Sequence, residues 1–128
     1  MAETKGKILI VEDDRYISKM YRLKLSLEGY DVQVAENGKD GVDKVKEFIP
    51  NIILLDILMP ELDGFEVLKI IKSDDVTKDI PVLIMSNLGQ EDHVEKGMKL
   101  GAIGYIVKSQ YTPSKVVEKI KSVINGES

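Results

Sequence analysis

Acidic residues, a hydroxyl and a lysine follow the short apolar runs of this sequence, and together they could carry phosphoryl chemistry. Three acids occupy residues 12–14 after the first run, Asp56 follows a later run, and Ser86 and Lys108 follow two more. A few carboxylates suit Mg²⁺, which binds through one or two of them together with a substrate phosphate. A divalent ion, a hydroxyl and an ammonium form a receptor for a phosphoryl group, which a facing aspartate can attack to form an acyl phosphate.

Five short apolar runs alternate with segments of helical period, which predicts an α/β fold. The runs cover residues 8–11, 31–35, 52–55, 82–85 and 103–107. Three of them are continuously apolar over four residues, as in strands that are buried on both faces of a parallel sheet. Five strand–helix units in succession predict a doubly wound parallel sheet with helices on both faces. Because parallel strands end at one edge, the polar residues after the runs should meet in a crevice there.

Apolar residues at helical spacing predict which helix faces pack on the sheet. Tyr16, Met20, Leu23 and Leu27 have the spacing of one face of a first helix, which ends at Gly29. The corresponding stripes of the later helices are Val42, Val45 and Ile49; Phe65, Leu68 and Ile71; Val94 and Met98; and Val116, Val117, Ile120, Val123 and Ile124.

Capping residues give further expectations about the helix ends. Asp14 is expected to cap the first helix rather than to bind a metal, and Thr112 is expected to cap the last, with Pro113 at its first position. Gly97 lies inside the fourth helix, where it lowers helix propensity by up to about 1 kcal/mol and makes that helix a plausible mobile element.

Composition narrows the function classes. The chain has 128 residues, 43% hydrophobic and 31% charged, which predicts a single domain over 1–128 with a core at about 6–125. The net charge of −4 argues against direct nucleic-acid binding. Because cysteine is absent and His93 is the single histidine, disulfides, thiolate sites and multi-histidine metal sites are excluded. No stretch approaches the ~20 apolar residues of a membrane helix, so we expect no membrane association and a cytoplasmic location.

Four motifs in this order carry a family resemblance. They are residues 8–14 (ILIVEDD), residues 54–64 (LLDILMPELDG), Met85-Ser86, and residues 101–108 (GAIGYIVK). With Ser86 30 residues and Lys108 52 residues after Asp56, the sequence resembles the receiver domain of bacterial two-component response regulators over essentially its whole length. The resemblance implies a flavodoxin-like, doubly wound sheet of five strands in the order 2-1-3-4-5.

The resemblance implies a role for each acidic residue of the site. Asp56 would be the phosphoacceptor. Mg²⁺ would be bound by Asp13, by Asp56 and by the backbone carbonyl of Leu58, while Glu12 would act through a metal-bound water.

The resemblance also implies which residues bind and sense the phosphoryl group. Lys108 would pair with Asp56 and then with the phosphoryl oxygens, which makes it the catalytic residue. Ser86 would hydrogen-bond the phosphoryl group, and Tyr105 would change its side-chain position as Ser86 moves.

Two positions depart from the family pattern, and two apolar residues flank the site. Ser109 stands where the family usually has a proline that supports a cis peptide, so we predict a trans Lys108–Ser109 bond. Ser86 stands where threonine is common, and the loss of its methyl group leaves the side chain less restricted. Leu58 and Leu88 flank the site, and neither can position a hydrolytic water, which predicts a long-lived phosphoryl group.

The preferred function is a phosphorylation-dependent signalling switch. It would accept the phosphoryl group from a histidine kinase or phosphotransfer protein and signal to an unknown downstream protein through its fourth helix, fifth strand and fifth helix. It would assist its own phosphorylation and dephosphorylation without being a stand-alone enzyme.

Two alternatives remain open, and one motif-based class is excluded. A Mg²⁺-dependent aspartyl-nucleophile phosphohydrolase would need an acid two positions after Asp56, where Leu58 stands. A phosphate-independent interaction module would not need the complete acidic set. A nucleotide-binding module would need one of two glycine-rich motifs, which are absent. His93 is expected to be an exposed surface histidine, and the chain is expected to be a single-domain regulator or a receiver from a longer protein.

Overall fold

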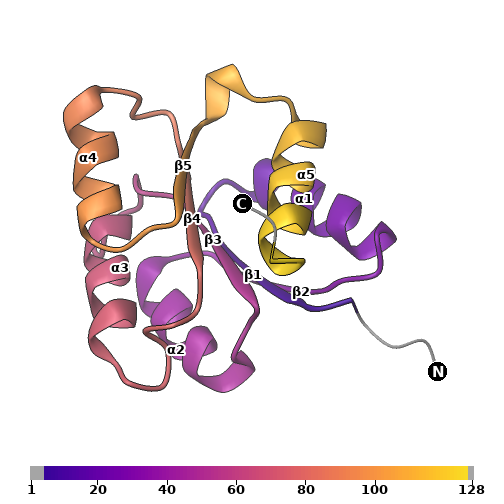
Figure 1. The fold of residues 1–128 in the computed structure, drawn as a ribbon, viewed down its shortest axis with the longest axis horizontal. Coiled ribbons are helices and arrows are strands. Elements are labelled where there is room, and N and C mark those ends of the chain that lie inside the picture. The colour runs from indigo at the N-terminus through magenta and orange to yellow at the C-terminus, as the bar shows by residue number, and fades with distance from the viewer. Residues whose placement is uncertain (1–4, 127–128) are drawn as a thin grey trace.

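Five strands and five α-helices alternate along the chain in the computed structural model, which describes residues 5–126 (Figure 1). The strands are β1 (Lys7–Val11), β2 (Asp31–Ala35), β3 (Ile52–Leu55), β4 (Val82–Ser86) and β5 (Gly104–Val107). The helices are α1 (Arg15–Leu27), α2 (Gly38–Phe48), α3 (Gly64–Ser73), α4 (Glu91–Lys99) and α5 (Pro113–Ile124), and a 3₁₀ turn, η1, covers Lys108–Gln110. The predicted strand–helix alternation is therefore confirmed.

The strands form one parallel sheet in the order β2-β1-β3-β4-β5, which confirms the predicted flavodoxin-like topology. In the register of the sheet, Val11 at the end of β1 pairs with Ala35 and Leu55, and Ser86 at the end of β4 pairs with Val107. The residues that follow β1, β3, β4 and β5 consequently lie along one edge, as parallel pairing requires.

Two apolar cores lie on opposite faces of the sheet, because the strand side chains alternate between the faces and both faces are covered. One core includes Leu9, Ile53 and Ile84 with residues of α2 and α3, and the other includes Ile10, Leu54 and Leu83 with residues of α1 and α5. Figure 1 shows α2, α3 and α4 on one side of the sheet and α1 and α5 on the other.

The predicted inward face of α1 is wrong for three of its four residues, since only Met20 packs against the core, where it is partly buried. Tyr16, Leu23 and Leu27 are 90%, 62% and 79% exposed, whereas Tyr21 and Leu25 are buried. Both sets have helical spacing, so periodicity could not decide between them. The connection from β1 fixes the rotation of α1 about its axis. This rotation turns Tyr21 and Leu25 toward the sheet, where they are buried.

The other predicted stripes are mostly confirmed. Phe65, Leu68 and Ile71 of α3 and Val116, Val117 and Ile120 of α5 are buried. Ile49 is 44% exposed because α2 ends one residue earlier, where Ile49 adopts a left-handed φ of 48°. Met98 of α4 is also 44% exposed.

The predicted caps and the predicted peptide geometry at Lys108 are confirmed. The Asp14 side chain accepts hydrogen bonds from the N–H groups of Tyr16 and Ile17, at 2.9 and 3.2 Å. Thr112 accepts one from Lys115, and Pro113 begins α5. None of the peptide bonds within residues 5–126 is cis, so the Lys108–Ser109 bond is trans. Among the helices of this described range, none is long and apolar enough to cross a membrane.

Candidate functional site

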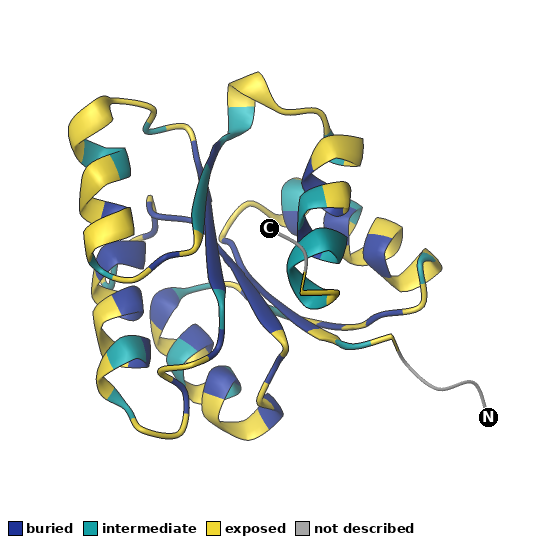
Figure 2. Cartoon of the chain, in the orientation of Figure 1, coloured by how far each residue is buried: buried dark blue, intermediate teal, exposed yellow. Residues whose placement is uncertain are grey.

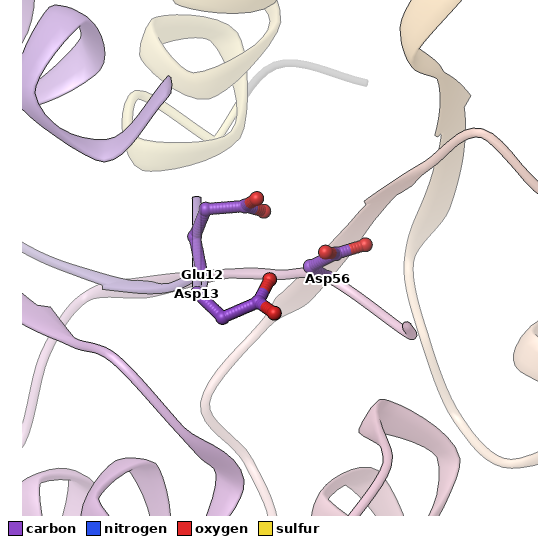
Figure 3. A group of neighbouring side chains, drawn as sticks. All are labelled: Glu12, Asp13 and Asp56. Carbon is purple, nitrogen blue, oxygen red and sulfur yellow. The ribbon is translucent and has the colours of Figure 1, made fainter. Parts of the chain in front are cut away.

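Three carboxylates meet at the edge of the sheet where β1 and β3 end. Ligand oxygens of Glu12, Asp13 and Asp56 all lie within 4.8 Å of one another. Figure 3 shows the side chains of Glu12 and Asp13 reaching from the end of β1 toward Asp56. Glu12 and Asp56 are buried and Asp13 is exposed, so the cluster has a solvent-facing side. Hard oxygen ligands of this kind suit Mg²⁺.

Backbone contacts fix the position of Asp56. Its N–H group donates to the carbonyl of Val11 at 3.0 Å, and its Oδ1 accepts from the N–H of Ile57 at 2.8 Å. Gly64, the first residue of α3, packs so closely beneath this segment that a Cβ there would overlap the carbonyl oxygen of Asp56. The sequence suggests only a turn at Gly64. In the structure, the missing side chain of Gly64 allows α3 to approach the backbone of Asp56 closely.

Lys108 pairs with two of the three acids. Its Nζ lies 3.2 Å from both carboxylate oxygens of Glu12 and 3.5 Å from Oδ2 of Asp56. The Lys108 side chain is 16% exposed, so this ion pair is largely shielded from water. The family resemblance implied Asp56 as the partner of Lys108, and nothing in the sequence indicated that Glu12 would be the nearer one.

Burial shifts the proton affinity of the two enclosed acids. Desolvation and the neighbouring charge of Asp56 raise the pKa of Glu12 to about 7, and Lys108 opposes the rise. Desolvation also raises the pKa of Asp56, again against the effect of Lys108. Glu12 and Asp56 therefore share the ammonium of Lys108, and the repulsion between the two carboxylates favours a bound cation.

Ser86 and Tyr105 meet at the backbone of Leu88. The N–H group of Leu88 donates to Oγ of the fully buried Ser86 at 3.2 Å, and its carbonyl accepts from the Tyr105 hydroxyl at 2.5 Å. Burial raises the pKa of the Tyr105 phenol, while a hydrogen bond with Ser86 opposes the rise. The two residues expected to sense the phosphoryl group are thus connected through one loop residue.

Leu58 and Leu88 both line a cavity of about 560 Å³ whose other lining residues come from the β3–α3 loop, α3 and α4. Leu58 is 56% exposed and Leu88 is partly buried. His93 and Phe65 also line this cavity, with ring centroids 6.5 Å apart and nearly parallel. The prediction of an exposed His93 is therefore wrong in part, because its side chain is 34% exposed and stacks on α3.

A family model described as the response regulator receiver domain matches residues 8–121. Chemotaxis protein CheY of Treponema pallidum is 41% identical over 122 residues, which cover 92% of this chain and 82% of that protein. The DNA-binding dual master transcriptional regulator RpaA of Synechocystis is 39% identical over 102 residues, covering 80% of this chain and 42% of RpaA. The chain spans about half the length of many curated relatives that it matches, such as 46% of a probable transcriptional regulator of Guillardia theta.

Solved structures share the fold. The receiver domain of Francisella response regulator 1452 has a TM-score of 0.86 at 27% identity, covering 94% of this chain and 97% of that one. Chemotaxis response regulator CheY4 of Vibrio cholerae has a TM-score of 0.85 at 27% identity, covering 92% and 98%. Because some relatives bind DNA, the expected absence of direct nucleic-acid binding stays a prediction. The chain belongs to the response regulator receiver domain family, whose members are phosphorylation-dependent signalling switches rather than stand-alone enzymes.

Proposed function

We propose that this receiver domain is switched when Asp56 accepts a phosphoryl group from a phosphohistidine of a histidine kinase or phosphotransfer protein. An Asp56 carboxylate oxygen forms a bond to phosphorus, and the phosphorus–nitrogen bond of the donor breaks. The leaving imidazole keeps the electron pair and takes a proton from solvent. The observation that carries the proposal is the enclosed Asp56 carboxylate, held by backbone contacts beside two further acids and Lys108.

Receiver domains generally bind Mg²⁺ at an acidic pocket, and the residues of this chain fit that ion. In the proposal, Asp13, Asp56 and the backbone carbonyl of Leu58 bind Mg²⁺ directly, and Glu12 acts through a water. When bound, the ion neutralises charge on the phosphoryl oxygens. The exposed side of the cluster at Asp13 gives ion and donor a route to Asp56.

Lys108 has the catalytic part in this proposal. Its ammonium already lies beside Asp56, and it turns from Glu12 toward the oxygens of the incoming phosphoryl group. A fixed cation in a site shielded from water stabilises developing negative charge more strongly than it would in bulk solvent. We further propose that the same residues support slow loss of the phosphoryl group to water.

Ser86 and Tyr105 carry the change outward in the proposal. When the Ser86 hydroxyl turns to the phosphoryl group, the N–H of Leu88 loses its acceptor, and Tyr105, bonded to the same residue, must adjust. Tyr105 lies on β5, so the face formed by α4, β5 and α5 changes and meets a downstream protein. The cytoplasmic location stays a prediction.

The test is phosphorylation by acetyl phosphate with Mg²⁺, followed by intact mass measurement. The parent should gain one phosphoryl group that is lost in base, EDTA should prevent the gain, and Asp56→Asn should gain none. Asp75→Asn, an exposed carboxylate outside the site, is the matched control and should behave as the parent. A parent that gains nothing, or an Asp56→Asn variant that gains the same group, would contradict the proposal.

A further inference from the structure

Helix α4 lies against the sheet at a glycine. Gly97 is buried, whereas the residues beside it in α4, Lys96 and Met98, are exposed. A Cβ at position 97 would lie 2.6 Å from Cδ1 of Ile84 on β4 and 3.2 Å from Cδ2 of Tyr105 on β5. Because real Cβ atoms essentially never approach closer than 3.0 Å, a larger residue at position 97 would require the end of the Ile84 side chain to shift and the Tyr105 ring to yield slightly.

Space, and not backbone freedom, explains the glycine. Gly97 has no positive φ, and it lies in the last turn of α4 rather than at the C-cap, which is Leu100. Alanine is the better helix former at such a position, so helix propensity would favour it. The glycine is therefore explained by the close approach that it permits between α4 and the side chains of Ile84 and Tyr105.

The Tyr105 side chain is held both at its ring and at its hydroxyl group. Its edge lies over Gly97, and its hydroxyl donates to the carbonyl of Leu88. Leu88 in turn donates to Ser86. A continuous set of contacts therefore connects Ser86, the residue proposed to bind the phosphoryl group, with the last turn of α4.

We propose that Gly97 is a positioning residue of the switch, whose missing side chain forms the slot in α4 that admits the inward Tyr105 ring. When the Tyr105 ring moves out of this slot, the packing of α4 against the sheet changes directly. The inference rests on the proposed function of Ser86 and Tyr105, and it adds the element on which Tyr105 acts.

A double-mutant cycle isolates the contact between the ring and residue 97. Ile84→Val is placed in every variant, because it removes the Cδ1 atom that a new Cβ would meet first. In that background, Gly97→Ala should lower the urea midpoint when Tyr105 is present. It should raise the midpoint when Tyr105→Ala has removed the ring, since alanine then acts only through helix propensity. Equal shifts in the two backgrounds would overturn the proposal.

Tyrosine NMR adds a readout that a merely structural role would not move. The Tyr105 ring signals, assigned with Tyr105→Phe among five tyrosines, are followed before and after addition of Mg²⁺ and beryllium fluoride, a phosphoryl mimic. The parent signals should shift, and Gly97→Ala with Ile84→Val should alter their starting position and reduce the shift. An unchanged starting position and shift in that variant would overturn the Gly97 proposal alone. Parent signals that do not respond would overturn the role of Tyr105 and the inference together.

Discussion

Two of the strand–helix units that contribute to the site differ in how much of their helix is buried against the sheet. In the acceptor half, β3 and α3, the helix buries Phe65, Val67, Leu68 and Ile71 after the loop that follows Asp56. In the detector half, β4 and α4, the helix that follows Ser86 buries Gly97, and Figure 2 shows α4 mostly exposed. Burial of a Val, Leu, Ile or Phe side chain stabilises by roughly 1.5–3 kcal/mol, and α4 has little of it.

This difference suits a switch. Asp56 must hold its geometry through the reaction, and it lies on the half with the deeper core. Ser86 and the loop to α4 must respond, and low local burial lets an element open or shift at a small free-energy cost. The same fold therefore supplies a fixed acceptor and a movable detector at neighbouring strand ends.

The largest expected effect concerns the charge enclosed beside the acceptor half. The pKa of Glu12 rises from 4.5 to about 7 in the folded protein, so between these values the unfolded state has lost a proton that the folded state keeps. The free energy of unfolding should therefore fall as pH rises through this interval in EDTA, by up to ~3 kcal/mol. Asp56 adds a dependence of the same sign.

Glu12→Gln should flatten this dependence, as measured by urea unfolding at a series of pH values. Glu118→Gln, an exposed side chain, is the matched control and should keep the slope of the parent. An unchanged slope in Glu12→Gln would show that Glu12 does not hold the proton.

The next largest effect compares the two helices through the same type of substitution, valine to alanine, in each of them. Val67→Ala in α3 removes a fully buried side chain and should lower the free energy of unfolding by about 2 kcal/mol. Val94→Ala in α4 removes a partly exposed one and should lower it by less than about 1 kcal/mol. Urea unfolding measures both, and equal losses would remove the contrast between the halves.

The smallest expected effect involves one residue from each half. Leu58 and Leu88 line the same cavity beside the site, and neither can orient a water. Leu58→Asn with Leu88→Gln should shorten the lifetime of the acyl phosphate by about tenfold, well below the ~10²–10⁴ of a positioned acid or base. The decay is followed by intact mass after removal of the donor. Val76→Asn, an exposed apolar residue elsewhere, should leave it unchanged, and an unaltered lifetime in the double variant would refute the idea.

The sheet and the acidic site could be predicted because strong, short-range patterns define both. The continuously apolar runs at 52–55 and 82–85 identify buried parallel strands, and parallel strands bring their carboxyl ends together. Asp56 and the acids at 12–13 could then be placed at one edge without coordinates.

The remaining features depend on three-dimensional contacts that spacing does not encode. Leu23 and Leu25 both lie in α1, and the packing against the sheet decides that Leu25 is the buried one. The position of Lys108 depends on the backbone after β5, which brings its ammonium nearest to Glu12. Gly97 looks like a weak point of a helix in the sequence, and its contact with Tyr105 appears only when α4 is seated on β5.

Hydrogen exchange tests the contrast between the two halves most directly. Amide exchange is measured over residues 64–73 of α3 and residues 87–99 of the loop and α4, with and without Mg²⁺ and beryllium fluoride. We expect exchange to change in residues 87–99 and to stay constant in α3, and we expect Asp56→Asn to abolish the change. Equal changes in both helices, or an undiminished change in Asp56→Asn, would contradict this expectation.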